Sequence, residues 1–275
     1  MNLASPATVH RLLRELDIRP RKSRGQNFLI DRNVLNILLD AAPLEPGRHV
    51  VEIGPGLGIV TEALEQRGVR VAAIEKDRAL ADYLRERFRD NENVYIVAAD
   101  ALDVPPDQAD GGPFDGMVAN LPYAAASRQL VQWAMARRPL RFLTVTIQLD
   151  VARRLAARPG TADYGPLTVW CGWRYTPRIV KAVKPSCFTP RPRVQSAIVR
   201  LDRRTDAPAG PRDPDAWFRL VKHAFGRRRK TLLNALPAAD RSALGSALRG
   251  LGFDPAARPE TLSVDDWVRL SDGLI

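Results

Sequence analysis

An apolar run at residues 114–120 ends in the tetrapeptide Asn120-Leu121-Pro122-Tyr123, whose groups could hold an aromatic amine. The side-chain oxygen of Asn120 and the backbone carbonyl of Leu121 or Pro122 are acceptors for the two amine hydrogens. Gripping both hydrogens would turn the nitrogen lone pair, normally delocalised into the ring, toward an electrophile. Pro122 would fix the backbone that carries these acceptors, and Tyr123 would offer a face for base stacking. The same residue types also build ordinary turns, so the assignment depends on the rest of the chain.

A second apolar run, at residues 49–53, leads into the glycine-rich segment at residues 54–58. Glycines at a strand-to-helix turn let the backbone approach a ligand at the carboxyl end of the strand. The spacing is G-x-G-x-G, and Ile59 stands where a dinucleotide fingerprint has its last glycine, which disfavours pyrophosphate binding. Glu75 and Asp100 end the next two apolar runs, where they could accept hydrogen bonds from a ribose diol and an adenine amine.

These groups together describe a cofactor that carries adenosine but no phosphate. S-adenosylmethionine fits best, because its sulfonium does not require a helix terminus that binds anions. Gly54 and Gly56 would lie against this cofactor, and Glu52 would add negative charge near its cationic methionine end. Chemistry at an amine held in this way needs no general base, which agrees with the lack of histidine near residue 120.

Five strand-like runs alternate with amphipathic stretches, which predicts βαβ units and a mostly parallel α/β sheet with helices on both faces. The runs lie at residues 49–53, 69–75, 93–99, 114–120 and 141–148, and later runs ending near residue 201 could close the sheet as a hairpin. Residues 202–216 are rich in Pro, Asp and Arg and read as a linker, and the segments beyond it have helical periodicity. We therefore predict a catalytic domain at 1–205, with a basic N-terminal segment, and a smaller all-helical domain at 206–275.

The charge balance favours a polyanionic partner. The chain of 275 residues has 42 Lys and Arg against 31 Asp and Glu, a formal charge of +11, and nucleic acid is the commonest partner for such a protein. A charge run is often only solvated surface, but two basic clusters beside an adenine-modifying cleft favour RNA contact. The predicted RNA-binding residues are Arg21, Lys22, Arg24, Arg227, Arg228, Arg229 and Lys230.

The other reactive side chains are few and scattered. The two cysteines and three histidines show no metal-ligand spacing, so we predict no metal site. Isolated cysteines suit a reducing compartment, and neither a signal-peptide pattern nor an apolar run of about 20 residues occurs. We therefore expect a cytoplasmic protein without membrane contact, and nothing in the sequence indicates an obligate dimer, so we expect a monomer.

The motifs resemble those of the ribosomal RNA adenine N6,N6-dimethyltransferases of the KsgA type, in the same order from about residue 19 to 271. NLPY and EIGPG are shared with many amino-methyltransferases, whereas RRRKTLLNAL and RPETLS are more specific. The matching segments are GQNFLID (25–31), VEIGPGLGIVTEAL (51–64), IEKD (74–77), NLPY (120–123), DYGPLTV (163–169), CFTPRPRVQSAIVRL (187–201), AFGRRRKTLLNAL (224–236) and RPETLSVDDW (258–267).

The resemblance implies a class I, Rossmann-like methyltransferase domain and a helical domain that docks on the small ribosomal subunit. It implies dimethylation of N6 on two adjacent adenines near the 3′ end of 16S ribosomal RNA, in ribosome biogenesis. Phe188 matches the aromatic residue that sandwiches a flipped adenine against Tyr123. The residues that match cofactor-contacting positions of the family are Asn27, Leu29, Gly54, Glu75, Asp100 and Asn120.

The sequence departs from the family pattern after Tyr123, where Ala124-Ala125-Ala126 replaces a usual Asn-Ile-Ser. This departure leaves the amine-binding residues intact but puts the finer substrate contacts, and the completion of both methylations, in doubt. Three alternatives stay open at this point. They are an Erm-type methyltransferase of large-subunit RNA that confers antibiotic resistance, a non-catalytic ribosome-assembly factor on the same fold, and an NAD-linked oxidoreductase, which Ile59 disfavours.

Overall fold

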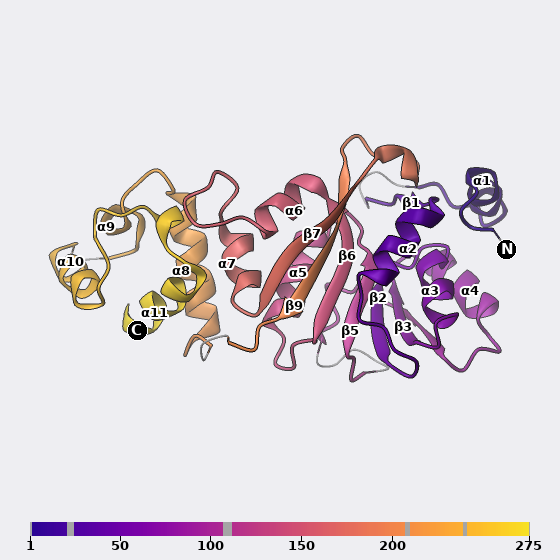
Figure 1. Ribbon diagram of the computed structural model, residues 1–275, viewed down its shortest axis with the longest axis horizontal. Helices are drawn as coiled ribbons and strands as arrows, with labels where there is room; N and C mark the ends of the chain where they lie inside the picture. Colours follow the sequence, from indigo (N-terminus) through magenta and orange to yellow (C-terminus); the bar gives the residue numbers. More distant parts are fainter. Residues whose placement is uncertain (1, 21–24, 107–111, 207–209, 239–240, 275) are drawn as a thin grey trace. The chain divides into compact units, whose positions relative to one another are not determined.

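The computed structural model describes residues 2–20, 25–106, 112–206, 210–238 and 241–274 (Figure 1). The chain forms two compact units: the first has residues 1–152 and 177–203, and the second has residues 153–176 and 204–275. A single division at 205/206 was predicted, and the structure differs by adding residues 153–176 to the second unit. The physical reason is aromatic packing, because Trp170 stacks on Phe218 with ring centroids 4.0 Å apart.

A seven-stranded sheet in the order β4-β3-β2-β5-β6-β9-β7 forms the centre of the first unit. Strands β2 to β6 are parallel and β9 runs antiparallel to β6, which confirms the predicted fold class and the late strands. The strands are β2 (His49–Ile53), β3 (Arg70–Glu75), β4 (Val94–Ala98), β5 (Gly116–Asn120), β6 (Phe142–Gln148), β7 (Tyr175–Val183) and β9 (Ser196–Arg203). The inner strands are mainly apolar because helices cover both of their faces.

Helices of the first unit bury their apolar stripes on this sheet. They are α2 (Arg32–Asp40), α3 (Ile59–Glu65), α4 (Arg78–Arg87), α5 (Ala126–Met135) and the first part of α6 (Leu149–Leu155), whose residues from Arg153 on belong to the second unit. The chain proceeds from β2 outward to β4, then returns to β5 on the other side of β2. The strand order therefore reverses between β2 and β5, and ligands of such sheets bind at the carboxyl ends of the strands at this switch point.

The N-terminal segment forms a separate two-stranded sheet with the connection between β7 and β9, which the sequence did not reveal. Strand β1 (Phe28–Leu29) pairs antiparallel with β8 (Phe188–Thr189), which follows a 3₁₀ turn at Pro185–Cys187. Helix α1 (Pro6–Glu15) begins at the cap Ser5, whose hydroxyl accepts a hydrogen bond from Thr8 N–H. Its apolar residues join a core cluster that also contains Phe28. This packing places the N-terminal motif beside the carboxyl ends of the strands.

The second unit is helical and is organised around aromatic residues. Trp217 and Trp267 are fully buried, and the Trp217 ring meets Trp173 edge-on with centroids 5.6 Å apart. The elements are α7 (Pro166–Gly172), α8 (Pro214–Gly226), α9 (Leu232–Ala235), α10 (Arg241–Gly250), the 3₁₀ turn Pro259–Thr261 and α11 (Val264–Leu274). No helix among the described residues is both long and apolar enough to span a membrane.

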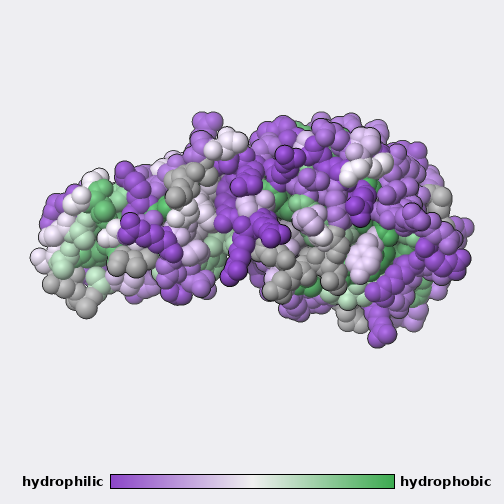
Figure 2. Space-filling view, turned by 90° about the horizontal axis from the view of Figure 1, so that it is seen from below, coloured by the Kyte–Doolittle hydropathy of each residue, from purple (hydrophilic) through white to green (hydrophobic). Residues whose placement is uncertain are grey.

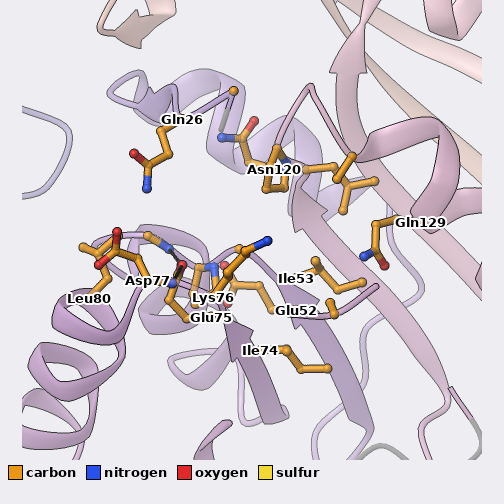
Figure 3. Close-up of a pocket in the computed structure, with 18 of the residues that line it drawn as sticks. Gln26, Glu52, Ile53, Ile74, Glu75, Lys76, Asp77, Leu80, Asn120 and Gln129 are labelled. Carbon is orange, nitrogen blue, oxygen red and sulfur yellow. Dashed lines mark hydrogen bonds between the residues drawn. The ribbon is translucent and has the colours of Figure 1, made fainter. Parts of the chain in front are cut away.

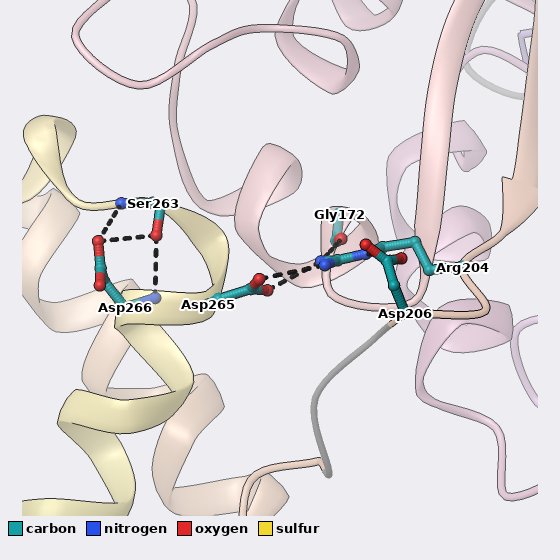
Figure 4. A network of polar contacts seen from close by, with 6 residues as sticks. All are labelled: Gly172, Arg204, Asp206, Ser263, Asp265 and Asp266. Atoms are coloured by element: carbon teal, nitrogen blue, oxygen red, sulfur yellow. Dashed lines mark hydrogen bonds and ion pairs between the residues drawn. The ribbon is translucent and has the colours of Figure 1, made fainter.

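Polar contacts fix helix α11 within this unit (Figure 4). The guanidinium of Arg204 donates to both carboxylate oxygens of Asp265, at 2.8 and 3.1 Å, and to the carbonyl of Gly172 at 3.3 Å. Ser263 and Asp266 cap the helix reciprocally, because each side chain accepts a hydrogen bond from the other residue's backbone N–H at 3.1 Å. Bidentate and capping bonds of this kind define where a helix begins.

Arg228, one of the predicted RNA-binding residues, is used inside the second unit. Its guanidinium donates to the carbonyls of Thr161 and Ala162, at 2.8 and 2.6 Å, and lies 3.6 Å from the carboxylate of Glu260. These three contacts tie the loop before α7 to the loop before α11. Arg228 therefore has a structural role that its place in a run of basic residues did not indicate.

We expect the Arg228→Ala variant to lower the free energy of unfolding by about 1–2 kcal/mol, because it removes charged hydrogen bonds and leaves Glu260 unpaired. Urea denaturation of the variant and the wild type measures the difference. The Arg229→Ala variant is the matched control, because Arg229 is exposed and its replacement removes the same charge. Equal stability of the two variants would contradict the structural role.

Candidate active site

A cavity of about 360 Å³ lies in the first unit at the carboxyl ends of the parallel strands. Its lining includes residues 25–29 of the N-terminal segment, the turn after β2, and the ends of β3 and β5 (Figure 3). The structure brings the predicted cofactor residues and much of the amine-binding tetrapeptide to this cavity. These residues are Asn27, Leu29, Glu52, Gly54, Gly56, Glu75, Asp100, Asn120, Leu121 and Pro122.

The amide of Asn120, the last residue of β5, is held in one orientation. Its Nδ2 donates to the carbonyl of Asn27 at 2.9 Å, and the Asn27 side chain in turn donates to the carbonyl of Gly25 at 3.1 Å. The Oδ1 atom of Asn120 is buried and has no hydrogen-bond partner among the described residues. Since a buried acceptor without a partner is costly, this oxygen is suited to a ligand donor.

Gly25, which the sequence reasoning did not single out, brings the N-terminal segment against the tetrapeptide. Its φ is +64°, and a Cβ atom at this residue would lie 2.8 Å from the backbone nitrogens of Tyr123 and Ala124. Backbone atoms cannot move aside as a flexible side chain does. The close approach explains why a glycine precedes the motif at residues 26–31.

Glu75 ends β3 in a fixed position. It is 6% exposed, and its carboxylate accepts from Gly56 N–H at 3.1 Å and from Asp77 N–H at 2.8 Å. Burial raises the pKa of Glu75, and these hydrogen bonds partly offset the rise. Each carboxylate oxygen has a second lone pair, so the group can still accept hydrogen bonds from a ligand diol.

Asp100 is engaged by a lysine that the sequence reasoning missed. Lys76 Nζ forms an ion pair with Asp100 Oδ2, and Leu102 N–H donates to Oδ1 at 3.0 Å. Burial acts to raise the pKa of Asp100, but the lysine and the backbone N–H hold it below its ordinary value. The Lys76 side chain is 61% exposed. It can therefore give up Asp100 to a ligand amine at small cost.

Glu52 is 1% exposed, and its Oε2 accepts from the hydroxyl of Thr61 at 2.6 Å. Burial raises the pKa of Glu52 to about 8, the Thr61 hydroxyl opposes this rise, and the charge of Glu75 adds to it. The carboxyl group is therefore mainly protonated at neutral pH. The cost of an ion in a buried site thus lowers the negative charge expected at Glu52 at neutral pH.

Gln129 is a further polar residue of the cavity (Figure 3). It lies on α5, is 1% exposed, and its Oε1 has no hydrogen-bond partner among the described residues. A signal was available in the sequence, because Gln129 is a polar residue beside Leu130 and Trp133 on the buried face of an amphipathic helix. One amide in such a stripe is a weak signal on its own, so the sequence alone does not assign Gln129 to a site.

Neither of the two aromatic residues predicted to stack on the target adenine is among the lining residues of the cavity. The hydroxyl of Tyr123 is hydrogen-bonded to Ser196 at the start of β9, and burial raises the Tyr123 pKa. Phe188 pairs with Leu29 across the β1–β8 ladder, is 2% exposed, and packs in the main core cluster. Stacking of a base between the two rings thus remains a prediction, which the described arrangement of Phe188 does not support.

The predicted RNA-binding residues differ in what the structure shows of them. Arg21, Lys22 and Arg24 lie outside the described residues. Arg227, Arg229 and Lys230 are exposed after α8, whereas Arg228 is bound within the second unit. Among the described residues, no group of three or more His, Cys, Asp and Glu side chains is arranged to hold a metal ion.

The groups at the cavity fit an adenosine-bearing ligand such as S-adenosylmethionine. The fixed Glu75 carboxylate, the ionised Asp100 and the unpartnered amide oxygens provide acceptors at separate points of the wall. Gly54 provides room, because a Cβ atom there would lie 2.8 Å from Pro122. The chemistry of these donors and acceptors therefore matches that of a nucleoside with a ribose diol and an exocyclic amine.

Comparison with known proteins agrees with this assignment. The model of the family described as ribosomal RNA adenine dimethylase matches residues 18–274. A protein of Pelotomaculum thermopropionicum named ribosomal RNA small subunit methyltransferase A is 41% identical, over 99% of this chain and 97% of its own length. A protein of the same name from Moorella thermoacetica is 40% identical, over 98% of each chain.

Two solved structures have similar folds. A dimethyladenosine transferase from Plasmodium falciparum superposes with a TM-score of 0.74 at 23% identity, over 88% of this chain and 95% of that one. The 23S rRNA methyltransferase ErmE superposes with a TM-score of 0.64 at 29% identity, over 90% of this chain and 99% of that one.

Proposed function

Because the chain belongs to the ribosomal RNA adenine dimethylase family, it is an S-adenosylmethionine-dependent RNA methyltransferase, and we propose that it acts on 16S ribosomal RNA during ribosome biogenesis. The proposed products are N6,N6-dimethyladenosines at two adjacent adenines near the 3′ end. The relatives that are 40–41% identical are named for the small subunit, whereas the large-subunit enzyme ErmE is 29% identical. This difference favours the small subunit as the target.

The observation that carries the proposed chemistry is the fixed, unpartnered oxygen of Asn120. Bound S-adenosylmethionine supplies an electrophilic methyl group. Asn120 Oδ1 accepts one hydrogen of the adenine amine, and the adjacent backbone carbonyls are acceptors for the other. With both hydrogens held, the nitrogen lone pair is directed out of conjugation with the ring. A neutral amide is too weak a base to keep the proton that leaves after transfer, so the proton passes to water.

We propose that the second unit docks on the immature 30S subunit. This proposal is supported by the exposed cations Arg227, Arg229 and Lys230 and by the overall charge of +11. We also propose that the cofactor contacts Asn27, Leu29 and the other predicted cofactor residues described above. Their common position at one cavity supports this proposal. A monomeric, cytoplasmic enzyme remains the expectation from the sequence.

Transfer of labelled methyl groups to unmethylated small subunits, large subunits and naked ribosomal RNA tests the proposed target. Digestion of the products to nucleosides separates monomethyladenosine from dimethyladenosine. We expect labelled dimethyladenosine from small subunits alone. Label in large-subunit RNA would overturn the target and favour the Erm-type alternative. Absence of label from every substrate, with cofactor still bound, would favour the non-catalytic assembly factor.

Glu52 predicts a pH dependence of cofactor binding. Its pKa is raised to about 8, so the Glu52 carboxyl of the folded protein keeps its proton at pH values between the ordinary pKa of a glutamate and about 8. A cation bound nearby would displace this proton. The affinity for cationic S-adenosylmethionine, relative to S-adenosylhomocysteine, should rise about three- to tenfold from about pH 6.5 to about 8.5. The ratio is informative because the two ligands share every group except the sulfonium methyl.

Titration calorimetry with both ligands at the two pH values measures this ratio. The Glu52→Gln variant is the control, since it keeps a neutral hydrogen-bonding group of the same size and cannot ionise. In this variant we expect a ratio that does not change with pH. A ratio in the wild type that is equally independent of pH would show that Glu52 does not ionise toward the ligand.

A further inference from the structure

A second hollow in the first unit, about 670 Å³ in volume, lies between α1 and the turn after β8. We call it the α1 groove. It is lined by Ala7, His10, Leu13, Arg14, Ile18, Arg19, Pro20, Thr189 and Pro190. None of these residues belongs to the lining of the active-site cavity. The face of the first unit seen in Figure 2 is mostly hydrophilic.

The α1 groove combines an apolar floor with positive charge. Leu13, Ile18 and the two prolines provide the floor, while Arg14 and Arg19 are exposed. Neither arginine forms an ion pair with another described residue, and no carboxylate occurs among the lining residues that the structure describes. The nearby Glu15 lies 3.7 Å from Arg11, on a different part of α1. Apolar surface beside unpaired cations suits a base or ribose followed by a phosphate.

The α1 groove and the active-site cavity are built on the same elements, α1 and the β1–β8 ladder. Val9 of α1 lines the cavity, and the next residue, His10, lines the groove. Across the β1–β8 ladder, Phe28 of the cavity pairs with Thr189 of the groove. The His10 ring and the Thr189 hydroxyl are hydrogen-bonded at 2.8 Å, which fixes α1 to this ladder. The cavity and the groove are thus formed by neighbouring residues of the same elements, so one strand of RNA could contact both.

We propose that the α1 groove binds a nucleotide adjacent to the target adenine, with its phosphate on Arg14 and Arg19 and its base or ribose on the apolar floor. This inference rests on the proposed function in one respect, namely that the substrate is RNA with an unstacked adenine. It adds a binding site for the flanking strand that lies outside the predicted basic clusters. The site contributes substrate affinity and register, and it does not contribute to cofactor binding.

The test compares the double variant Arg14→Ala/Arg19→Ala with the wild type in binding a short, labelled, single-stranded RNA that contains adjacent adenines. We expect affinity to fall about tenfold, and the slope of log K against log salt to decrease by about 1–2, as expected for two lost phosphate contacts. The KM for small subunits should rise while kcat and the affinity for S-adenosylhomocysteine stay unchanged. The variant Arg14→Lys/Arg19→Lys should keep most of the salt slope, because it keeps both charges.

The variant Arg11→Ala/Arg85→Ala is the matched control. It removes the same charge from two exposed arginines that pair with Glu15 and Asp82, outside the groove. Equal loss of affinity in both double variants would show that the loss depends only on net charge, and it would overturn the proposal. A circular dichroism spectrum confirms that α1 is intact. If small subunits prove to be the wrong substrate but the RNA binding still depends on the groove, the proposed function fails and the groove assignment stands.

Discussion

Replacing Asn120 by alanine should lower the single-turnover rate of methyl transfer by about 100-fold or more, because it removes the acceptor that we propose for the target amine. In the structure Asn120 Oδ1 is buried and unpartnered, and Nδ2 is fixed on the carbonyl of Asn27. Such an acceptor needs no rearrangement when the amine arrives. The same substitution should weaken cofactor binding by a smaller factor, since the lost bond to Asn27 loosens the N-terminal wall of the cavity.

Thr146 offers a matched control for this variant. It pairs with Asn120 in the β5–β6 ladder, and its hydroxyl is also buried without a partner among the described residues. The Thr146→Val change removes that hydroxyl at nearly constant volume, so we expect unchanged activity and equal or higher stability. Thermal unfolding of both variants reports the fold, and calorimetry with S-adenosylhomocysteine reports the cofactor site. An Asn120→Ala enzyme within a few fold of the wild-type rate would remove the assignment of Asn120 to the amine.

The positions of the main site residues could be predicted because they follow a regular rule. Each of the strands β2 to β5 is a mainly apolar run, and a polar or glycine residue at or just after its last position marks the carboxyl end. Gly54, Glu75, Asp100 and Asn120 follow such runs, and in a parallel sheet all of these ends meet at one edge. Sequence reasoning therefore placed them at one cavity without knowledge of any side-chain contact.

Contacts between distant segments could not be predicted by this rule. Asn27 and Asn120 are 93 residues apart, and the two-residue ladder between Leu29 and Phe188 is too short to give a period. Residues 153–176 have ordinary amphipathic character, and long-range contacts such as the stacking of Trp170 on Phe218 place them in the second unit. Local periodicity reports which face of an element is buried, but not which other element covers it.

Charge at a site was harder to predict than position. Glu52 was correctly placed at the cavity, yet burial keeps its carboxyl group mainly protonated at neutral pH. Lys76 had no role in the sequence reasoning, although its ion pair holds Asp100 ionised. Arg228 stands in a run of four basic residues but is bound to backbone carbonyls. Ionisation and availability depend on desolvation and partners, which only the folded structure provides.

The Gly54→Ala variant should bind S-adenosylhomocysteine at least about 100-fold more weakly than the wild type, and methyl transfer should fall by at least as much. Gly54 has a φ of +68°, and an added Cβ atom would lie 2.8 Å from Cγ and 3.0 Å from Cδ of Pro122. The rigid ring of Pro122 cannot rotate away, so the clash would displace the backbone carbonyls that accept the amine hydrogens. One methyl group would thereby disturb both the cofactor wall and the amine site.

A Gly47→Ala variant distinguishes the effect of this clash from the effect of backbone strain alone. Its φ is +79°, similar to that of Gly54, but no atom lies within 4 Å of the position of an added Cβ. The Gly47→Ala variant should therefore lose about 1–2 kcal/mol of stability from left-handed backbone strain and keep wild-type binding and activity. Calorimetry and thermal unfolding of the two variants distinguish the causes. If both lose stability alike and both still bind the cofactor normally, the close approach of Gly54 to Pro122 has no role in forming the site.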